Sequence, residues 1–398
     1  KAGPRTRGWR RRGAAAGVAT SRSACAATNM EARVVGHRPR DLSTTEASLW
    51  YQTDQAEERL RASGRTVEDP ALNAFVHGLI CEISGPFCAD LRLYVVDTPD
   101  FNASMAPNGM AVVNTGLLIR AETVDELAFV LGHEFVHFEE NHFLERHAAI
   151  RNANITSSIL GSALAAAGGG AFTSLTSLAA YSGAANFSQD QESEADSKGL
   201  DYAVAAGYSA TAGAEIWSHF LAELSASDLD AVRNRRGGGI LGTHPHIERR
   251  IEDLTAQAET LPSPEQDQAS YRALIRPHLH TWLADHVVRQ DHGATLVLID
   301  RLSEQGTDLG VLLNARGRVL VLRGDEGDTE EALETFQTAA THDDAPADVW
   351  RSMAEIHRQA GRHANAAAAF QSYLDRAPDA RDRALIESLI IDLTGTSS

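Results

Sequence analysis

The sequence has few cysteines and no long apolar run. Only Cys25, Cys81 and Cys88 occur in 398 residues, which excludes a cysteine-rich zinc module or a disulfide-dense scaffold. No uninterrupted apolar stretch reaches the about 20 residues that a membrane-spanning helix needs. Positive charge is also scarce, because 36 Lys and Arg stand against 54 Asp and Glu, for a formal net charge of −18. Such an acidic chain argues against nucleic acid as the main partner.

The few basic residues gather at the N-terminus. Residues 1–42 begin with Lys1 rather than Met and carry the cluster Arg10 to Arg12 before a short stretch of small residues. This order resembles a secretory signal, in which Cys25 would be a site for a lipid anchor. A disordered tail or a misplaced start is the alternative interpretation. Under both interpretations the segment lies outside the fold, and the length of the remainder suggests two or three domains.

Cys81 and Cys88 flank a loop-like stretch, Glu82–Phe87, that can bring them together. A disulfide between them fits an exported protein. Two buried free thiols fit equally well.

The stretch Ala128–His142 contains the HExxH pattern as His133-Glu134-Phe135-Val136-His137. Residues four apart share one face of a helix, so His133 and His137 can hold one metal ion between them. Glu134 then projects beside that pair, where its carboxylate can take the proton from a metal-bound water. The pattern predicts a metal-dependent hydrolase, although the pentapeptide also occurs by chance.

A catalytic zinc ion needs a third protein ligand, and the later stretch Gln189–Gly199 offers one. On a helix Glu192 and Asp196 share a face, so Glu192 can bind the metal while Asp196 hydrogen-bonds a ligating imidazole. Glu194 is the rival ligand, but it points about 160° away from Asp196 on a helix. Gly199 permits close helix packing.

The residues before the HExxH helix predict a strand at Leu91–Val96 and a hairpin turning at Asn108-Gly109. A strand edge beside the metal can hold an extended substrate by backbone pairing. Asn102–Asn114 is the candidate edge, with Asn102, Ala103 and Asn114 as substrate-binding residues. A purely structural hairpin is the alternative.

Two later segments are harder to interpret. Residues 157–187 are rich in Ala, Gly and Ser, which predicts a helical hairpin, with a mobile flap or a membrane-surface contact as the alternative. A glycine loop then leads to His244, a histidine placed to reach toward the metal. Arg250 follows six residues later and can pair with a carboxylate such as Asp196.

Together these segments resemble the gluzincin metallopeptidases that include the CAAX prenyl endopeptidases, HtpX and the Oma-type proteases. The matches are FNASMAPNG…VVNTGLL, LAFVLGHEFVHFEENH, ESEAD with Gly199, and THP followed by Arg250. The resemblance implies one zinc ion per chain, with Asp196 in support and His244 and Arg250 near the reacting carbonyl as catalytic groups. It implies His133, His137 and Glu192 as ligands and Glu134 as general base.

The C-terminal part carries a repeat. Gly327, Ala332 and Phe336 recur as Gly361, Ala366 and Phe370, each after 34 residues, which is the tetratricopeptide (TPR) period. We therefore expect an α+β, zincin-like metallopeptidase domain at residues 43–260, mostly helical with a small β-sheet. A linker at 261–270 and an all-α TPR-like domain at 271–398, closed by a helix at Leu385–Leu393, would follow.

The combination resembles the soluble, exported branch of the family, which carries C-terminal TPR repeats. It predicts a zinc metalloendopeptidase of the bacterial periplasm or cell envelope that acts in protein quality control. Its substrates would be unfolded or misassembled proteins, and the repeats would bind a protein partner. The alternatives are a chaperone or assembly factor whose site is closed by His244, and a scaffold with an inactive peptidase fold.

Overall fold

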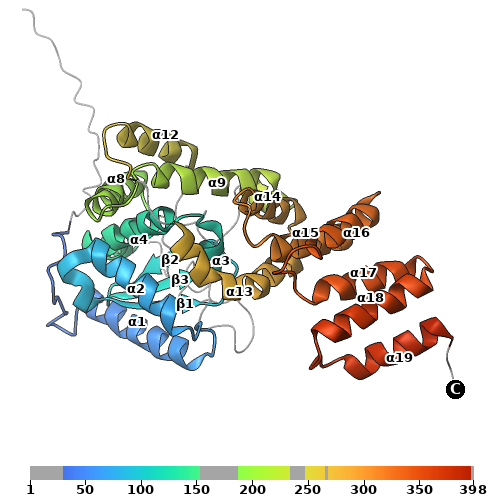
Figure 1. Cartoon of the computed structure of the whole chain (residues 1–398). Coiled ribbons are helices and arrows are strands. Elements are labelled where there is room, and N and C mark those ends of the chain that lie inside the picture. The colour runs from blue at the N-terminus through green and yellow to red at the C-terminus, as the bar shows by residue number, and fades with distance from the viewer. Residues whose placement is uncertain (1–29, 153–186, 234–246, 265–267, 396–398) are drawn as a thin grey trace, which may run out of the picture.

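The computed structural model describes residues 30–152, 187–233, 247–264 and 268–395, and this part is mostly helical around one small sheet (Figure 1). The helical hairpin predicted at 157–187 lies, apart from Phe187, outside the described residues. His244 and Cys25 also lie outside them. Up to residue 258 the elements are α1 (Thr45–Ala62), α2 (Pro70–Ser84), the 3-10 helix η1 (Gly85–Asp90), β1 (Arg92–Val96), β2 (Ala103–Met105), β3 (Met110–Asn114), α3 (Thr115–Arg120), α4 (Val124–Glu139), α5 (His142–Asn152), α8 (Gln189–Ala205), α9 (Ala212–Ala226), α10 (Asp230–Arg233) and α12 (Ile247–Ala258).

The sheet has the order β1-β3-β2, with β1 parallel and β2 antiparallel to β3. Gly109 closes the β2–β3 turn with φ +83°, a conformation that glycine adopts without strain. The Gly109 N–H donates to the Ala106 carbonyl at 2.9 Å. The predicted strand and hairpin are thus confirmed, and β2 is an outer strand of the sheet.

Helix α4, which carries the HExxH sequence, lies at the centre of the main core. Every residue from Val124 to Phe138 is buried, because the helix is apolar on most of its faces. The Thr123 side chain caps its first turn by accepting from the Glu126 N–H at 3.1 Å. Helices α2, α8 and α9 and strand β2 pack against α4, so the site is formed where several elements meet.

The first of the C-terminal helices lie against this core, and the later ones extend from it as an arm (Figure 1). Within it α15 packs with α16 and α17 packs with α18. The elements are α13 (Gln268–Val288), α14 (His292–Ser303), α15 (Leu309–Arg323), α16 (Asp328–Ala339), α17 (Asp348–Gln359), α18 (His363–Arg376) and α19 (Arg383–Thr394).

The main hydrophobic core continues into this C-terminal region. Side chains of α13, α14 and α15, from Tyr271 to Val319, belong to the same buried cluster as the residues around α4. The Tyr271 hydroxyl donates to the Leu118 carbonyl at 2.6 Å. The core therefore runs across residues 261–270, where the sequence predicts a linker.

Residues 34 apart occupy equivalent places in the arm. Each glycine has a positive φ at the start of a helix: Gly327 is the N-cap of α16, and Gly361 directly precedes the N-cap of α18. An alanine and a phenylalanine on each of these helices are fully buried. The predicted closing helix is present as α19. The equivalent pairs are Gly327 and Gly361, Ala332 and Ala366, and Phe336 and Phe370.

Among the described residues, one stretch meets the length and composition expected of a candidate membrane span, the 21 residues Pro70–Asp90. It comprises α2 and η1, and Leu72, Val76 and Ile80 of α2 lie in the main core. Buried core helices satisfy the same criterion.

Candidate active site

Helix α4 and helix α8 bring the predicted metal ligands to one buried point. The Nε2 atoms of His133 and His137 lie 3.0 Å apart. Glu192 Oε2 lies 3.7 Å from His133 Nε2, and Glu192 Oε1 lies 3.5 Å from His137 Nε2. All three side chains are at most 3% exposed. The cluster therefore brings together side chains from α4 and α8, two helices that are far apart in the sequence.

The donor set fits a divalent metal ion. Metal–ligand bonds of about 2.0–2.2 Å place the ligand atoms of one tetrahedral ion roughly 3.3–3.6 Å apart, close to the separations of these three groups. Burial lowers the pKa of His133 to about 4, outweighing the carboxylates of Asp196 and Glu192, which raise it. Its imidazole is thus neutral at pH 7, as a metal ligand must be.

Two glycines allow α4 and α8 to approach this closely. A Cβ atom on Gly199 would lie 2.7 Å from the His133 backbone nitrogen, and one on Gly132 would lie 2.6 Å from the Gly199 carbonyl oxygen. No larger residue fits at the crossing without a shift of backbone. The predicted role of Gly199 is confirmed, and it is this contact that carries Glu192 to the histidines.

A buried ion pair orients His133. Its Nδ1 lies 2.9 Å from Asp196 Oδ1, and Arg250 donates to both oxygens of Asp196 at 2.6 and 2.5 Å. Burial would raise the pKa of Asp196, but the Arg250 guanidinium outweighs it and the pKa is lowered. Arg250 is itself held by Trp217 of α9, with its Cζ 3.9 Å from the ring centroid. An ionised carboxylate therefore fixes the ring of one ligand.

His137 is supported from the other side by a second histidine. Its Nδ1 lies 2.9 Å from the Nδ1 of His142, the first residue of α5. His142 is 2% exposed, and its Nε2 faces Glu194 Oε2 at 3.4 Å. Phe187 stacks on the His137 ring with centroids 3.9 Å apart. Each of the two imidazoles thus has its own partner at Nδ1, Asp196 for His133 and His142 for His137.

The two candidate glutamates occupy different positions. Glu192 lies at the two histidines, whereas Glu194 points to His142 and forms an ion pair with Lys198 at 2.6 Å. Asp196 contacts His133 and Arg250, as the shared helix face predicts. Glu134 is 5% exposed on the same helix as the ligating histidines.

The predicted substrate-binding residues need one correction. Asn114 belongs to the central strand, and its N–H already donates to the Asn102 carbonyl at 3.1 Å. Neither of these two groups is open to a substrate, since both are used between β2 and β3. Of the three predicted residues, Ala103 lies in the outer strand, where alternation directs the backbone groups of Ala103 and Met105 away from β3.

Sequence reasoning missed Trp217 and His142 as parts of the site. Trp217 lies well beyond Gly199, where the predicted acidic stretch ends, and matches no motif, so the sequence gives no signal for it. His142 does offer one, since it lies five residues after His137 in the stretch singled out above. Arg250 is 4% exposed and also lies 3.1 Å from Glu192 Oε2, which places it beside a ligand as well as beside Asp196.

Two histidines four apart on one buried helix, with a glutamate from a second helix, define the class of HExxH metallopeptidase centres. Residues 66–258 match the model of peptidase family M48. This match confirms the predicted resemblance to HExxH metallopeptidases over that part of the chain.

Curated relatives carry protease names. The chain is 36% identical over 104 residues to the mitochondrial metalloendopeptidase OMA1 of Bos taurus, covering 25% of this chain and 19% of that protein. It is 24% identical over 256 residues to the beta-barrel assembly-enhancing protease of Yersinia pestis, covering 62% and 50%. The protein of the same name from Escherichia coli K12 is 26% identical over 214 residues, covering 51% and 42%. The chain thus spans half or less of the length of these relatives.

Proposed function

We propose that this protein is a zinc-dependent endopeptidase that cleaves protein substrates. The observation that carries the proposal is the buried cluster of His133, His137 and Glu192 beside Glu134, in a domain of family M48. Two imidazoles and one carboxylate are a ligand set that zinc favours, with a fourth position left for water or substrate. Zinc, when bound, supplies Lewis-acid activation of the scissile carbonyl and a more acidic water.

The protein side chains then have separate tasks. His133 and His137 present their Nε2 atoms to the metal because Asp196 and His142 hold the opposite ring nitrogens. Glu134 accepts the proton of the attacking water and returns it to the leaving amine. Arg250 keeps Asp196 ionised; a direct action of Arg250 or His244 on the reacting carbonyl remains part of the proposal.

The substrate would bind in extended form along β2. This strand packs against α4 and has β3 on one side. The backbone N–H and C=O groups of Ala103 and Met105 point away from β3, so an added strand can pair with them. Backbone pairing suits substrates of varied sequence, such as unfolded or misassembled proteins.

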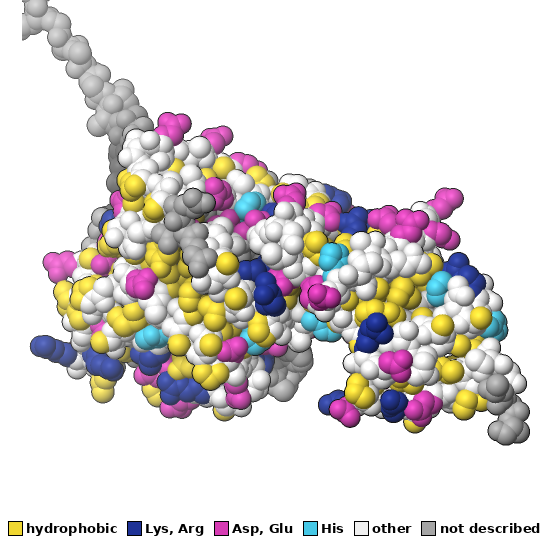
Figure 2. Space-filling model, in the orientation of Figure 1, with side chains coloured by type: hydrophobic (Ala, Val, Ile, Leu, Met, Phe, Trp, Pro, Cys, Tyr) yellow, Lys and Arg dark blue, Asp and Glu magenta, His cyan; other side chains and the backbone are white. Residues whose placement is uncertain are grey.

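The C-terminal arm would bind a protein partner or client through TPR-like repeats. A groove of about 370 Å³ lies between α15, α16 and α17. Its apolar lining includes Val321 and Leu322, which are 46% and 47% exposed, and Figure 2 shows hydrophobic side chains on this part of the arm. Arg318 and Arg351 border the groove together with Asp348 and Glu355, so charged side chains of both signs surround its apolar lining.

The bacterial relatives are named for enhancing beta-barrel assembly, which supports a role in protein assembly, and we place this role in the cell envelope as part of the proposal. The second candidate function is a chaperone or assembly factor whose peptidase site is closed by His244. Activity of the His244→Ala variant separates the two candidates. A rise in cleavage identifies an inhibitory plug, and a fall identifies a group that serves the reaction.

The central test is Glu134→Gln, assayed by casein cleavage and by zinc content. We expect cleavage to fall by about two orders of magnitude or more with one zinc retained, because the base is lost and the ligands stay. Glu192→Gln should lose zinc as well as activity. Glu215→Gln, an exposed change on α9, is the matched control. Casein cleavage by Glu134→Gln at the wild-type rate would refute the mechanism.

A further inference from the structure

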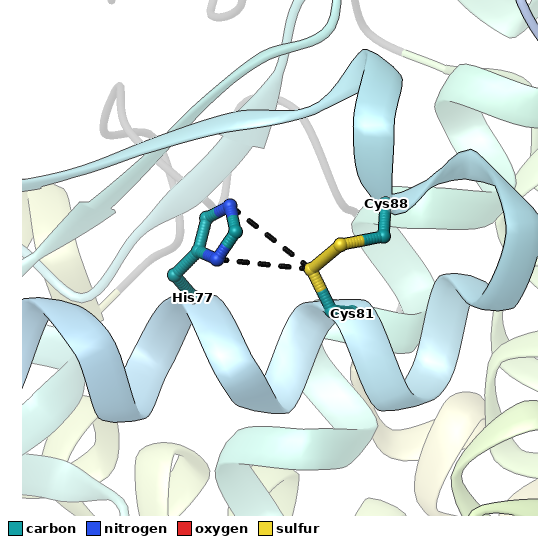
Figure 3. Close-up of side chains that lie close together, drawn as sticks. All are labelled: His77, Cys81 and Cys88. Atoms are coloured by element: carbon teal, nitrogen blue, oxygen red, sulfur yellow. Dashed lines mark hydrogen bonds between the residues drawn. A yellow bond between two sulfur atoms is a disulfide. The ribbon is translucent and has the colours of Figure 1, made fainter.

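A second group of metal-binding side chains lies away from the active site, at the end of α2 (Figure 3). His77 and Cys81 are four residues apart on one face of α2, and Cys88 reaches them from η1. The donor atoms of the three side chains all lie within 4.8 Å of one another. In the structure Cys81 and Cys88 form a disulfide, so of the predicted alternatives the disulfide is present.

The local fold explains why these residues meet. Helix α2 ends at Ser84, and Gly85 turns the chain with φ +54° into η1. The turn brings the Cα atom of Cys88 to 4.6 Å from that of Cys81. The His77 ring lies against the same sulfur, with Nδ1 3.7 Å and Nε2 4.0 Å from Cys81 Sγ.

We propose that reduction of this disulfide creates a binding site for a thiophilic metal ion such as Zn²⁺, with His77, Cys81 and Cys88 as ligands. A low-molecular-weight thiol would reduce the bond. Two molecules of this thiol supply two electrons and two protons, which convert Cys81 and Cys88 to free thiols, and the two molecules join in a disulfide of their own. Metal binding then releases the two thiol protons and leaves two thiolates and one neutral imidazole on the ion.

The geometry suits this ligand set. Zinc bonds of about 2.0 Å to nitrogen and 2.3 Å to sulfur place a nitrogen and a sulfur ligand roughly 3.5 Å apart. The His77 Nδ1 to Cys81 Sγ distance of 3.7 Å is close to this value without movement. Once the bond between the sulfurs is broken, rotation of the two cysteine side chains separates them. All three residues are partly exposed, so a thiol and a metal ion can reach them.

The site also has a structural consequence next to the catalytic helix. Phe87 of η1 is 7% exposed and packs edge-on against Phe135 and Phe138 of α4, with ring centroids 5.5 and 6.2 Å apart. The disulfide ties this segment to α2. A metal ion in its place would maintain the tie after reduction, so that Phe87 remains against α4 in both redox states.

Cobalt provides a direct test, because thiolate-to-cobalt charge transfer is an absorption that the catalytic cluster of His133, His137 and Glu192, which has no sulfur, cannot produce. The full chain with Cys25→Ser is titrated with Co²⁺ before and after reduction. We expect the charge-transfer band only after reduction, at one equivalent per chain, and its displacement by Zn²⁺. Cys88→Ser should abolish the band.

His77→Ala tests the third ligand and should weaken cobalt binding by about tenfold or more. His278→Ala is the matched control, since His278 contacts Asp69 at the start of α2 but lies apart from the cysteines. Circular dichroism checks that each variant is folded. A reduced protein without the band, or a His77→Ala variant with unchanged affinity, would overturn the proposal. Neither result depends on casein cleavage, so this proposal and the proposed peptidase function can each be refuted without the other.

Discussion

The guanidinium of Arg250 stacks on the indole ring of Trp217, with its Cζ 3.9 Å from the ring centroid. Trp217 comes from α9 and Arg250 from α12, and Arg250 in turn holds Asp196 of α8 against His133 of α4. Four helices therefore meet in one chain of contacts that ends at the predicted metal ligand His133. The orientation of that ligand depends on the packing of the whole domain.

Replacing Arg250 should destabilise the fold strongly. Arg250→Ala leaves Asp196 and Glu192 buried without their cation, which costs on the order of 3–5 kcal/mol for broken buried pairs. Urea unfolding measures the change. Arg249→Ala is the neighbouring control, because the Arg249 side chain is 61% exposed and such surface pairs contribute at most about 1 kcal/mol. Equal losses for the two variants would contradict the buried ion pair.

His142→Ala should weaken metal binding. His142 holds Nδ1 of His137, and removal of such a partner typically lowers metal affinity by about 10- to 100-fold. Competition with a chromogenic chelator measures the zinc affinity. His363→Ala, an exposed histidine on α18, should leave it unchanged. An unaltered affinity in His142→Ala would mean that His137 is oriented without it.

Gly199→Ala tests the contact between α4 and α8. The added methyl group would lie 2.7 Å from the His133 backbone nitrogen, and such overpacking costs about 1–3 kcal/mol. The zinc affinity should fall with it, since Glu192 moves with α8. Gly78→Ala is the matched control, because no atom lies within 4 Å of its added Cβ, and alanine favours a helix interior by up to about 1 kcal/mol. In thermal unfolding, the melting temperature should therefore fall for Gly199→Ala and rise for Gly78→Ala.

Met105→Pro tests the outer strand as the substrate edge. Proline removes the N–H that points away from β3, so kcat/KM for a casein-derived peptide should fall while zinc content is retained. Met105→Ala controls for the lost side chain, because it keeps the N–H. If the two variants cleave equally, the substrate does not pair with this N–H.

The stability of the fold should depend on His219 in a pH-dependent manner. Burial would lower the pKa of His219, but Glu126, whose Oε1 lies 3.1 Å from its Nδ1, raises it above 6.5. Burial also raises the pKa of Glu126, against the effect of His219. The folded pair thus holds a proton to higher pH than the unfolded chain does.

Its stabilising contribution is complete below the unfolded pKa of His219, about 6.5, and is lost as pH rises through the folded value. His219→Gln should therefore reduce the free energy of unfolding more at pH 6 than at pH 9. Urea unfolding at the two pH values measures this difference. A loss that is the same at both would show that His219 contributes through packing alone.

The parts of the site that could be predicted are those set by the period of a helix. The helix period determines which residues share a face, wherever the helix lies in the fold. It predicts that His133 and His137 lie together, and that Glu192 rather than Glu194 shares a face with Asp196. Arg250 could also be predicted as a partner of Asp196, because it lies in the first turn of the helix that follows the glycine loop.

The parts that could not be predicted depend on contacts between elements. Trp217 reaches Arg250 only through the packing of α9 on α12 and α4, which has no local pattern. The mistaken inclusion of Asn114 has the same origin, because sequence alternation reveals a hairpin but not which strand β1 will join. Local periodicity also does not reveal that α4 and α13 share one hydrophobic core.

Helix α15 belongs to two cores at once. Leu312 and Val319 pack in the main cluster, whereas Leu320 packs with the helices of the arm. Bending at this junction would expose apolar side chains on both sides, which is unfavourable. The arm is therefore held in a fixed position relative to the predicted peptidase domain. A polypeptide bound to the arm would reach the proposed metal site only at a fixed distance along its own sequence. Cleavage sites would therefore be selected by their spacing from the segment that is bound.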